Sequence, residues 1–274
     1  MKKNCIWGKR RRLPVILAAC AAEVIVAVGV GQAGGAQRAA SLPTQINPAA
    51  QALLDQSIQA LGGQAFIDFK TMTSEGRVFS IADGVLQGFV HYTSAEEFPD
   101  RRRLSYGLSK KSKAVTLINN GDNGWELDRY GTIQQPQKEI RAWRLANRYS
   151  LENLLRLRIR EPGMLIQMGK QDFVDNLPVQ IVEMADARQA QIKLYLNIST
   201  HLPLQIGYRI LDAQTHQWNE YSDIYSDYQT VQGTQTAMHI IRYLNGDRVA
   251  ETFRSEVRYN ETYPASFFGD QGGR

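Results

Sequence analysis

The second half of the chain constrains the fold most, because seven segments with a two-residue hydrophobic period follow one another there with short connections. They are 164–173, 179–184, 191–197, 202–211, 217–228, 237–244 and 250–259. Strands joined by so few residues pair antiparallel with their neighbours. Asn245-Gly246, between the last two segments, is a typical hairpin turn. The pattern therefore predicts an antiparallel meander.

The alternation within these segments predicts one dry face and one wet face of the sheet. In one segment, Ile192, Leu194 and Leu196 alternate with Lys193 and Asn197. In the last segment, Phe253, Val257 and Tyr259 alternate with Arg254, Glu256 and Arg258. An antiparallel sheet commonly packs one such face on the core and turns the other to water. We therefore expect Phe253 in the core and Arg254 in solvent.

Five more strand-like segments come earlier in the chain. They are 77–81, 85–94, 102–108, 114–119 and 125–129. Asp83-Gly84 joins the first two as a hairpin, and Leu86, Gly88, Val90 and Tyr92 fall on one face of the second. A sheet of so many strands curls, because strand twist accumulates and open edges are unfavourable. We expect the α+β class, mainly antiparallel β, as a curled and incomplete β-barrel of about 11 strands.

Two helical regions interrupt this pattern. Residues 47–63 have Asn47 as a cap, Pro48 at the first helical position and a glycine pair as a stop. The apolar stripe of this helix consists of Ala50, Leu53, Leu54, Ile58 and Leu61. A second helical region spans 137–160, with Ser150 as a cap. We expect helices to cover the concave face of the sheet.

The first 36 residues have the layout of an export signal. Basic residues precede an apolar run from Leu13 to Val30 that only Glu23 interrupts. Three interpretations stay open: cleavage after Ala36, lipoprotein-type cleavage before Cys20 with lipidation of that cysteine, and an uncleaved membrane anchor. We expect 1–36 to be a signal peptide or membrane anchor, 37–46 a tether and 47–274 a single domain. The protein is then periplasmic, either free or held at a membrane.

This leader also accounts for the basic balance of the chain. The full sequence has 32 basic and 27 acidic residues, a net charge of +5. Six of the basic residues and one of the acidic residues lie in 1–36, so the remainder has 26 of each. A neutral exported domain gives no reason to expect nucleic acid as a partner. Both cysteines, Cys5 and Cys20, lie in the leader, so we expect a domain without disulfides, and we expect it to be a monomer.

A search for chemistry finds no motif typical of a metal, cofactor or nucleophile site. The four histidines, His91, His201, His216 and His239, lack the spacing of metal ligands, so we expect no metal and no cofactor. Asp223 and Asp227 share one face of a strand and could act as acid and base in a hydrolase. Four residues along a strand separate their Cα atoms by about 13 Å, however. We therefore predict no catalytic residue and no enzyme.

Two basic clusters flank one predicted strand. They are Arg101, Arg102 and Arg103 on one side, and Lys110, Lys111 and Lys113 on the other. We interpret them as charges that protect a solvated sheet edge. Contact with anionic lipid headgroups is the alternative.

The order of these elements resembles a known family. The resemblance rests on the leader, a first helix ending in Ala60-Leu61-Gly62-Gly63, a glycine turn before Trp125, a helical insert, and a closing meander that contains Tyr225-Ser226-Asp227-Tyr228 and ends at Pro264-Ala265-Ser266-Phe267-Phe268. Together they resemble the periplasmic outer-membrane lipoprotein-sorting proteins. That group is similar to the lipoprotein carrier and its outer-membrane receptor.

The resemblance implies an apolar cavity that shelters acyl chains between the helices and the sheet. The residues that we expect to line it are Leu54, Ile58, Leu61, Leu86, Val90, Leu194, Leu204 and Ile206. The partner would be lipid acyl chains or a lipoprotein, with membrane contact as an option. If side chains fill the space under the first helix, the hypothesis fails. A periplasmic sensor or interaction module on the same fold is the second hypothesis, and the hydrolase is the third.

Overall fold

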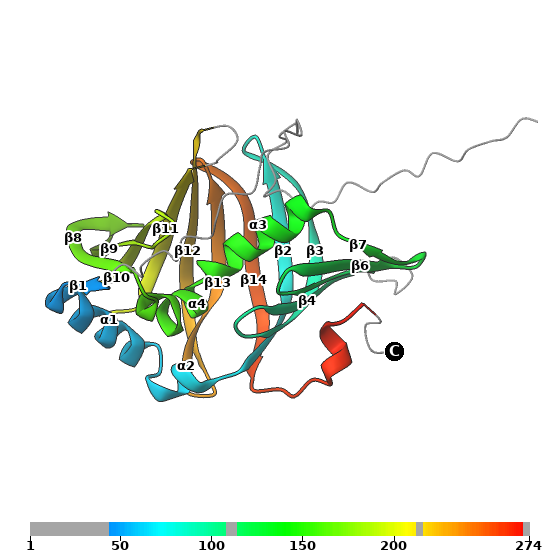
Figure 1. Ribbon diagram of the computed structural model, residues 1–274, viewed down its shortest axis with the longest axis horizontal. Helices are drawn as coiled ribbons and strands as arrows, with labels where there is room; N and C mark the ends of the chain where they lie inside the picture. The colour runs from blue at the N-terminus through cyan, green and yellow to red at the C-terminus, as the bar shows by residue number, and fades with distance from the viewer. Residues whose placement is uncertain (1–43, 108–113, 212–215, 271–274) are drawn as a thin grey trace, which may run out of the picture.

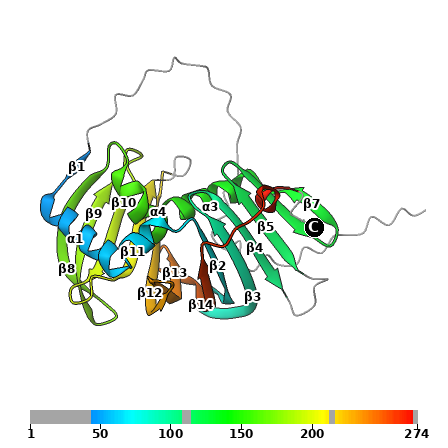
Figure 2. The same ribbon diagram turned by 90° about the horizontal axis from the view of Figure 1, so that it is seen from below.

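The computed structural model describes residues 44–107, 114–211 and 216–270, and these form one 14-stranded sheet with helices on one side (Figures 1 and 2). The strand order is β1-β8-β9-β10-β11-β12-β13-β14-β2-β3-β4-β5-β6-β7. All neighbours pair antiparallel except β1 and β8, which pair parallel. The two meanders predicted from the sequence therefore join through β14 and β2. The expected curled, open and mainly antiparallel architecture is confirmed.

The strand bounds are as follows. They are β1 Gln45–Ile46, β2 Thr71–Ala82, β3 Val85–Glu97, β4 Arg101–Gly107, β5 Val115–Asn120, β6 Asn123–Asp128, β7 Gly131–Gln134, β8 Leu165–Val174, β9 Leu177–Ala185, β10 Gln191–Asn197, β11 Pro203–Leu211, β12 Trp218–Val231, β13 Thr234–Leu244 and β14 Asp247–Tyr259. The two short strands β1 and β7 were not predicted, and they form the two edges of the sheet.

The position of β4 corrects one prediction. β4 lies between β3 and β5, so Arg101, Arg102 and Arg103 do not protect a sheet edge. Arg101 pairs with Glu97, and Arg103 donates to the carbonyl oxygen of Phe267 at 3.1 Å. The second basic cluster, Lys110, Lys111 and Lys113, lies outside the described residues. Cys20 and the rest of the leader lie outside them as well.

Both predicted hairpin turns are confirmed. Asp83 and Gly84 have φ angles of 51° and 73°, and Asn245 and Gly246 have φ angles of 52° and 88°. Two successive residues with positive φ are what a two-residue hairpin of matching twist requires. These turns fix the register of β2 with β3 and of β13 with β14.

The first helix, α1 (Pro48–Ala60), begins and ends as its sequence predicts. The side chain of Asn47 accepts hydrogen bonds from the backbone N–H groups of Ala49 and Ala50 at 2.9 and 3.2 Å. After α1, Gly62 packs so closely on the carbonyl oxygen of Gly233 that a Cβ there would clash. The short helix α2 (Gln64–Asp68) follows.

The second helical region forms α3 (Gln137–Arg148), α4 (Leu151–Arg156) and the 3-10 turn η2 (Arg158–Arg160). Ser150 caps α4 by accepting a hydrogen bond from the N–H of Asn153 at 3.3 Å. At the end of α3, Arg148 contacts the carboxylates of Glu161 and Asp186. The 3-10 turn η3 (Ala265–Phe268) closes the described chain. No helix in the described ranges is long and apolar enough to cross a membrane.

The main core lies between the helices and one face of the sheet. It contains buried residues of α1, α2 and α4 together with Ile206, Tyr225 and Met72 from three strands. We call the face that carries these three residues the covered face, and the opposite one the outer face. Figure 2 shows the helices between the two wings of the curved sheet, so the covered face is the concave one.

A β-bulge in β14 overturns the predicted alternation of that strand. The register shifts between Arg254 and Glu256, because Arg254 pairs with Gly76 but Val257 pairs with Ser74. One extra residue reverses the side to which the following side chains point. Arg254 therefore lies on the covered face, and Phe253 lies on the outer face with 38% exposure. The prediction was wrong for both residues.

Candidate functional site

The space under α1 is filled by side chains. Leu54, Ile58 and Leu61 are 0%, 6% and 1% exposed, and they share one buried cluster with Leu194 and Ile206 of the sheet. These five predicted residues are thus brought together as packed core. The hypothesis of an acyl-chain cavity directly beneath α1 therefore fails for this conformation, and a site for acyl chains has to be sought in another part of the molecule.

Two further predicted residues, Leu86 and Leu204, lie outside this cluster because of β-bulges. In β3, Leu86 pairs with Ile81 while Gly88 pairs with Ser80, so Leu86 faces away from Val90 and is 56% exposed. In β11, the partners of Leu196 and Tyr195 are Pro203 and Gln205, which leaves Leu204 as the extra residue. Leu204 packs in a second, smaller cluster with Val174 and Val179.

The remaining predicted residue, Val90, lies in the part of the covered face that α1 does not reach. Val90 of β3 pairs with Val78 of β2, and Leu104 of β4 pairs with Leu117 of β5. Val90, Leu104 and Leu117 are half-buried and belong to neither buried cluster. We call the covered face of strands β2 to β5 the β2–β5 face. It presents apolar side chains that the core does not use.

Helix α3 runs in front of β13, β14 and β2 (Figure 1), and its side chains reach residues at the ends of β4 and β6. Its buried side chains are Ile140 and Trp143. The guanidinium carbon of Arg102 lies 5.7 Å from the ring centroid of Trp143, and a Cβ on Gly124 would clash with Ile140. Ile140 and Trp143 thus anchor α3 to the sheet, while Leu145 of the same helix packs against the main core.

Two guanidinium groups on this face, those of Arg254 and Arg102, form no direct ion pair among the described residues. Arg254 Nη1 donates to the carbonyl oxygen of Ala237 at 3.0 Å, and Arg102 Nη2 donates to Asn119 Oδ1 at 3.0 Å. The Nε of Arg102 is buried and has no acceptor. Burial lowers the pKa of Arg102.

Two carboxylates influence these groups. Glu96 lies opposite Arg102 in the pairing of β3 with β4, and Ser94 Oγ donates to it at 3.2 Å. Burial raises the pKa of Glu96, and the carboxylate of Glu152 on α4 raises it further. Burial lowers the pKa of Arg254, but Tyr92 and Glu152 outweigh this and raise it. Glu152 is therefore the one acidic group of α4 that acts on the charges of the sheet.

Tyrosines complete the polar lining near this region. Burial raises the pKa of Tyr225 well above its usual range and raises the pKa of Tyr259 to about 12. Tyr228 donates to the carbonyl oxygen of Pro203 at 2.6 Å, and the hydroxyl groups of Tyr259 and Thr236 are 2.8 Å apart. These phenols stay protonated at neutral pH and supply uncharged donors.

The sequence analysis missed Arg102 and Arg254. For Arg102 the sequence held a signal, because a two-residue period places Arg102 on the same strand face as Leu104 and Tyr106. For Arg254 the alternation pointed the wrong way, since nothing in the sequence marks Ser255 as the extra residue of a bulge. The site therefore depends on a register that only the structure reveals.

The two aspartates considered for catalysis have separate partners. Asp223 accepts two hydrogen bonds from Arg242, at 2.8 Å from Nε and 2.9 Å from Nη2. Asp227 has a positive φ of 53° and contacts the side-chain amide of Gln229 at 3.3 Å. This arrangement gives Asp223 the role of a counter-ion to Arg242.

A serine, a histidine and a glutamate form a line across three strands on the outer face. Ser226 Oγ lies 2.9 Å from His239 Nδ1, and His239 Nε2 lies 2.7 Å from Glu251 Oε1. The His239 ring stacks on Phe253 with a centroid distance of 4.3 Å. Ser226 is directly opposite His239 in the register of β12 with β13, so the two side chains meet across this strand pair. The line is a cross-strand hydrogen-bond ladder.

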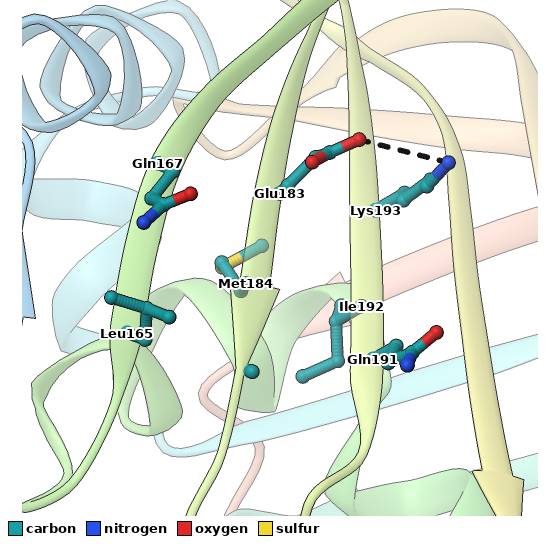
Figure 3. A pocket seen from close by; sticks show the side chains of 8 residues that line it. Leu165, Gln167, Glu183, Met184, Gln191, Ile192 and Lys193 are labelled. Atoms are coloured by element: carbon teal, nitrogen blue, oxygen red, sulfur yellow. Dashed lines mark ion pairs between the residues drawn. The ribbon is translucent and has the colours of Figure 1, made fainter.

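The two best-defined hollows of the described surface lie away from the β2–β5 face. One, of about 200 Å³, lies against β8 to β10, where Glu183 and Lys193 form a half-exposed ion pair at 3.7 Å (Figure 3). The other, of about 350 Å³, borders the Arg148, Glu161 and Asp186 network. The first hollow has a mainly apolar lining that includes Leu165, Met184 and Ile192 beside this ion pair, and the second is bordered by charged side chains. No group of three metal-ligating side chains occurs in the described ranges.

Comparison with solved structures identifies the architecture. A LolA superfamily protein from Nitrosomonas europaea matches with a TM-score of 0.53 and 12% identity, over 81% of this chain and 98% of that one. The chain has the fold of the LolA superfamily. An outer membrane lipoprotein-sorting protein domain from Vibrio parahaemolyticus shares this LolA-like fold, with a TM-score of 0.50, 10% identity and the same coverage. The resemblance inferred from the sequence is thus confirmed at the level of the fold.

A third match widens the group. A DUF1329 family protein from Desulfovibrio piger has a TM-score of 0.54 and 9% identity, again over 81% of this chain and 98% of that one. No family model and no curated protein matches the sequence. At such identities the LolA-like fold is what these proteins share, and function has to be argued from the residues of this chain.

Proposed function

We propose that this protein is a non-catalytic, exported binding protein that shelters acyl chains of lipids or lipoproteins on its β2–β5 face. One observation carries the proposal: Leu104 and Leu117, which are opposite each other, and Val90, which lies beyond the paired Tyr92 and Tyr106 on the same face, belong to neither core cluster. The LolA-like fold supports it, because the solved relatives include lipoprotein-sorting proteins by name. Transfer of each methylene group out of water contributes about 0.8 kcal/mol.

Binding on this face requires α3 to move. The helix is tied to the sheet by Trp143 over Arg102, by the ion pair of Arg144 with Asp122 and by a 2.7 Å hydrogen bond from Asn147 to the carbonyl oxygen of Pro99. Apart from these contacts, α3 buries Ile140 and Trp143, whereas α1 buries Ala50, Leu54 and Ile58 within the main core. In our proposal α3 opens as a lid and α1 stays in place.

The proposal includes export to the periplasm. Residues 1–36 act as a signal peptide or membrane anchor, 37–46 act as a tether, and the chain from residue 47 forms one binding domain. The last two tether residues, Gln45 and Ile46, pair with Leu165 and Ile166, so the tether leads directly into the sheet. The domain acts as a monomer beside a membrane that supplies or receives the lipid.

Native mass spectrometry tests this function. The full chain is expressed with its leader, extracted gently from the cell envelope and sprayed without organic solvent. We expect adducts whose masses fall within the range of acylated lipids, and their loss on treatment with detergent. A protein that carries no such adduct, and takes up none from added phospholipid vesicles, would contradict the proposed function.

A further inference from the structure

We propose that the convex outer face of the sheet docks on a lipid bilayer through an apolar patch at its crest. The exposed members of this crest patch are Leu86, Phe89, Leu211, Trp218 and Phe253. The inference rests on the proposed function, because a protein that receives or delivers lipid works beside a membrane. It adds to that function the surface that meets the membrane, on the side of the sheet away from the helices.

Three phenylalanines form the centre of the crest patch. Phe253 of β14 pairs with Arg77, and Phe79, two residues further along β2, pairs with Phe89 of β3, so all four side chains lie on the outer face. The ring centroid of Phe79 lies 5.4 Å from that of Phe89 and 5.6 Å from that of Phe253. The β-bulge in β3 turns Leu86 to the same side. Phe253, Phe89 and Leu86 are 38%, 51% and 56% exposed.

Strands β11 to β13 extend the crest patch. Ile224 of β12 pairs with Ile241 of β13 on the outer face, and both are half-buried. Leu211 pairs with Trp218, and these two residues are 46% and 40% exposed. The guanidinium carbon of Arg209 lies 5.2 Å from the ring centroid of Trp218. An exposed tryptophan beside a long cationic side chain is typical of a membrane–water interface.

The crest patch departs from the wet outer face that strand alternation predicts. Monomeric proteins rarely expose large contiguous apolar areas, and such areas mark contacts with proteins, ligands or membranes. The hairpin of β2 and β3 adds to this exposure, because residues 78–90 contain one charged residue, Asp83, and it lies in the turn. Natural sheets usually place charges where an apolar surface would otherwise aggregate. The missing charges therefore indicate that the outer face has an apolar partner.

Two ion pairs lie on the outer face beside the crest patch. Arg209 pairs with Glu220, and Arg248 pairs with Glu251. Arg77 is exposed, and its long side chain can lay its stem on apolar surface while its charged end reaches a lipid phosphate. Apolar burial therefore drives the docking, and we expect it on zwitterionic as well as on anionic lipid.

The shape of the sheet favours a bilayer over other occupants. The strands of the crest patch are consecutive in the middle of the strand order, where the sheet turns between its two wings (Figure 2). A convex crest can sink into the deformable head-group layer, whereas the crests of two rigid copies touch over a small area. A single lipid on a convex surface would leave much of its acyl chain in water. The occupant is therefore a bilayer surface.

The chain before Thr44 is long enough to allow this contact. Residues 31–43 separate the apolar run 13–30 from Thr44, and these thirteen residues span at most about 45 Å. A leader held in a membrane therefore keeps the domain within reach of the same bilayer. Where the leader is cleaved, the crest patch is what brings the released domain to the membrane.

Hydroxyl-radical footprinting tests the inference. The full-length protein is oxidised alone, with vesicles of phosphatidylcholine, and with vesicles of phosphatidylethanolamine and phosphatidylglycerol, and peptide mass spectrometry measures each side chain. Phe173 of β8 is the internal control, because it is 69% exposed and lies in one wing of the sheet. Relative to Phe173, we expect both kinds of vesicle to lower the oxidation of Phe89 and Trp218 at least about threefold. This local readout separates contact by the crest patch from attachment by the leader.

Matched variants assign the contact to the crest patch. The double variant Leu86→Glu, Phe89→Glu places two carboxylates among the apolar side chains, so we expect Trp218 to lose its protection by vesicles. Phe173→Glu makes the same kind of change in the wing and should leave that protection intact. Trp218→Glu, with Phe89 as the reporter, repeats the test from the other side of the patch should the double variant fail to fold.

The possible outcomes lead to distinct conclusions. Oxidation of Phe89 and Trp218 that vesicles leave unchanged overturns the inference, and so does equal protection of Phe173. Protection that needs no vesicles and grows with protein concentration assigns the patch to a second copy and overturns it as well. Protection by vesicles in a protein that carries no lipid adduct supports docking and contradicts the proposed function. A lipid adduct without protection leaves the proposed function intact and overturns docking.

Discussion

Gly76 in β2 packs directly against the carbonyl oxygen of Phe253 in β14, and no Cβ fits between them. This close approach accompanies the bulge at Ser255, which turns Arg254 to the covered face. The glycine is therefore what allows the sheet to present an arginine to its concave side.

Gly76→Ala is expected to lower the free energy of unfolding by about 1–3 kcal/mol, because an added methyl group in a filled space forces the backbone to shift. Urea unfolding measures the change. Gly107→Ala is the matched control, since Gly107 also lies in a strand but has open space at its Cβ position and no positive φ. It should leave stability unchanged or raise it by up to about 1 kcal/mol. Equal losses in the two variants would contradict the packing described for β2 and β14.

Leu54→Ala and Leu86→Ala are expected to differ strongly. Leu54 is fully buried in the main core, so truncation should cost about 2–5 kcal/mol. Leu86 is 56% exposed beside a bulge, so truncation should change stability by less than about 0.5 kcal/mol. Chemical denaturation of both variants gives the comparison. A large loss for Leu86→Ala would show that the bulge in β3 is misplaced.

The helices and most strands of this fold could be predicted from the sequence. Hydrophobic period, the Asn47 and Ser150 caps and the two hairpin turns predicted the helices and the antiparallel sheet. The strand count fell short because β1 and β7 are too short to show alternation. A two-residue edge strand is fixed by its partner rather than by its own residues, so its pattern carries no signal.

Glu96 is expected to make stability depend on pH. Burial raises its pKa in the folded state above the ordinary value of 4.5, so the folded protein binds the proton more tightly than the unfolded chain does. The stability that this proton confers is fully present below about pH 4.5 and is lost as pH rises through the folded-state pKa. Glu96→Gln mimics the protonated form. Its stability relative to the native protein should therefore increase with pH and level off above the folded-state pKa.

Urea unfolding of the native protein and of Glu96→Gln over a series of pH values measures this dependence. Glu97→Gln is a useful control, since the neighbouring Glu97 forms an ion pair with Arg101. A gap between native protein and Glu96→Gln that stays constant with pH would be inconsistent with a buried, proton-binding Glu96.

The candidate site was less predictable than the fold for a definite reason. A single extra residue in a strand exchanges its two faces, and three such bulges affect Leu86, Leu204 and Arg254. Five predicted apolar residues, three on α1 and two on the sheet that faces it, were brought together, but as packed core. Periodicity predicts that a side chain is buried, and it does not tell a packed interior from a ligand-binding wall.

Photo-crosslinking tests the central claim most directly. A fatty acid with a diazirine near the end of its chain is bound to the full-length protein, irradiated, and mapped by peptide mass spectrometry. We expect labels on the covered face of β2 to β5, at or beside Val90, Leu104 and Leu117, and none on the outer-face residue Phe89 of the same strand as Val90. Labels that fall on Phe89 and Phe253, or under α1 at Leu54 and Ile58, would contradict the assignment of acyl-chain binding to the β2–β5 face.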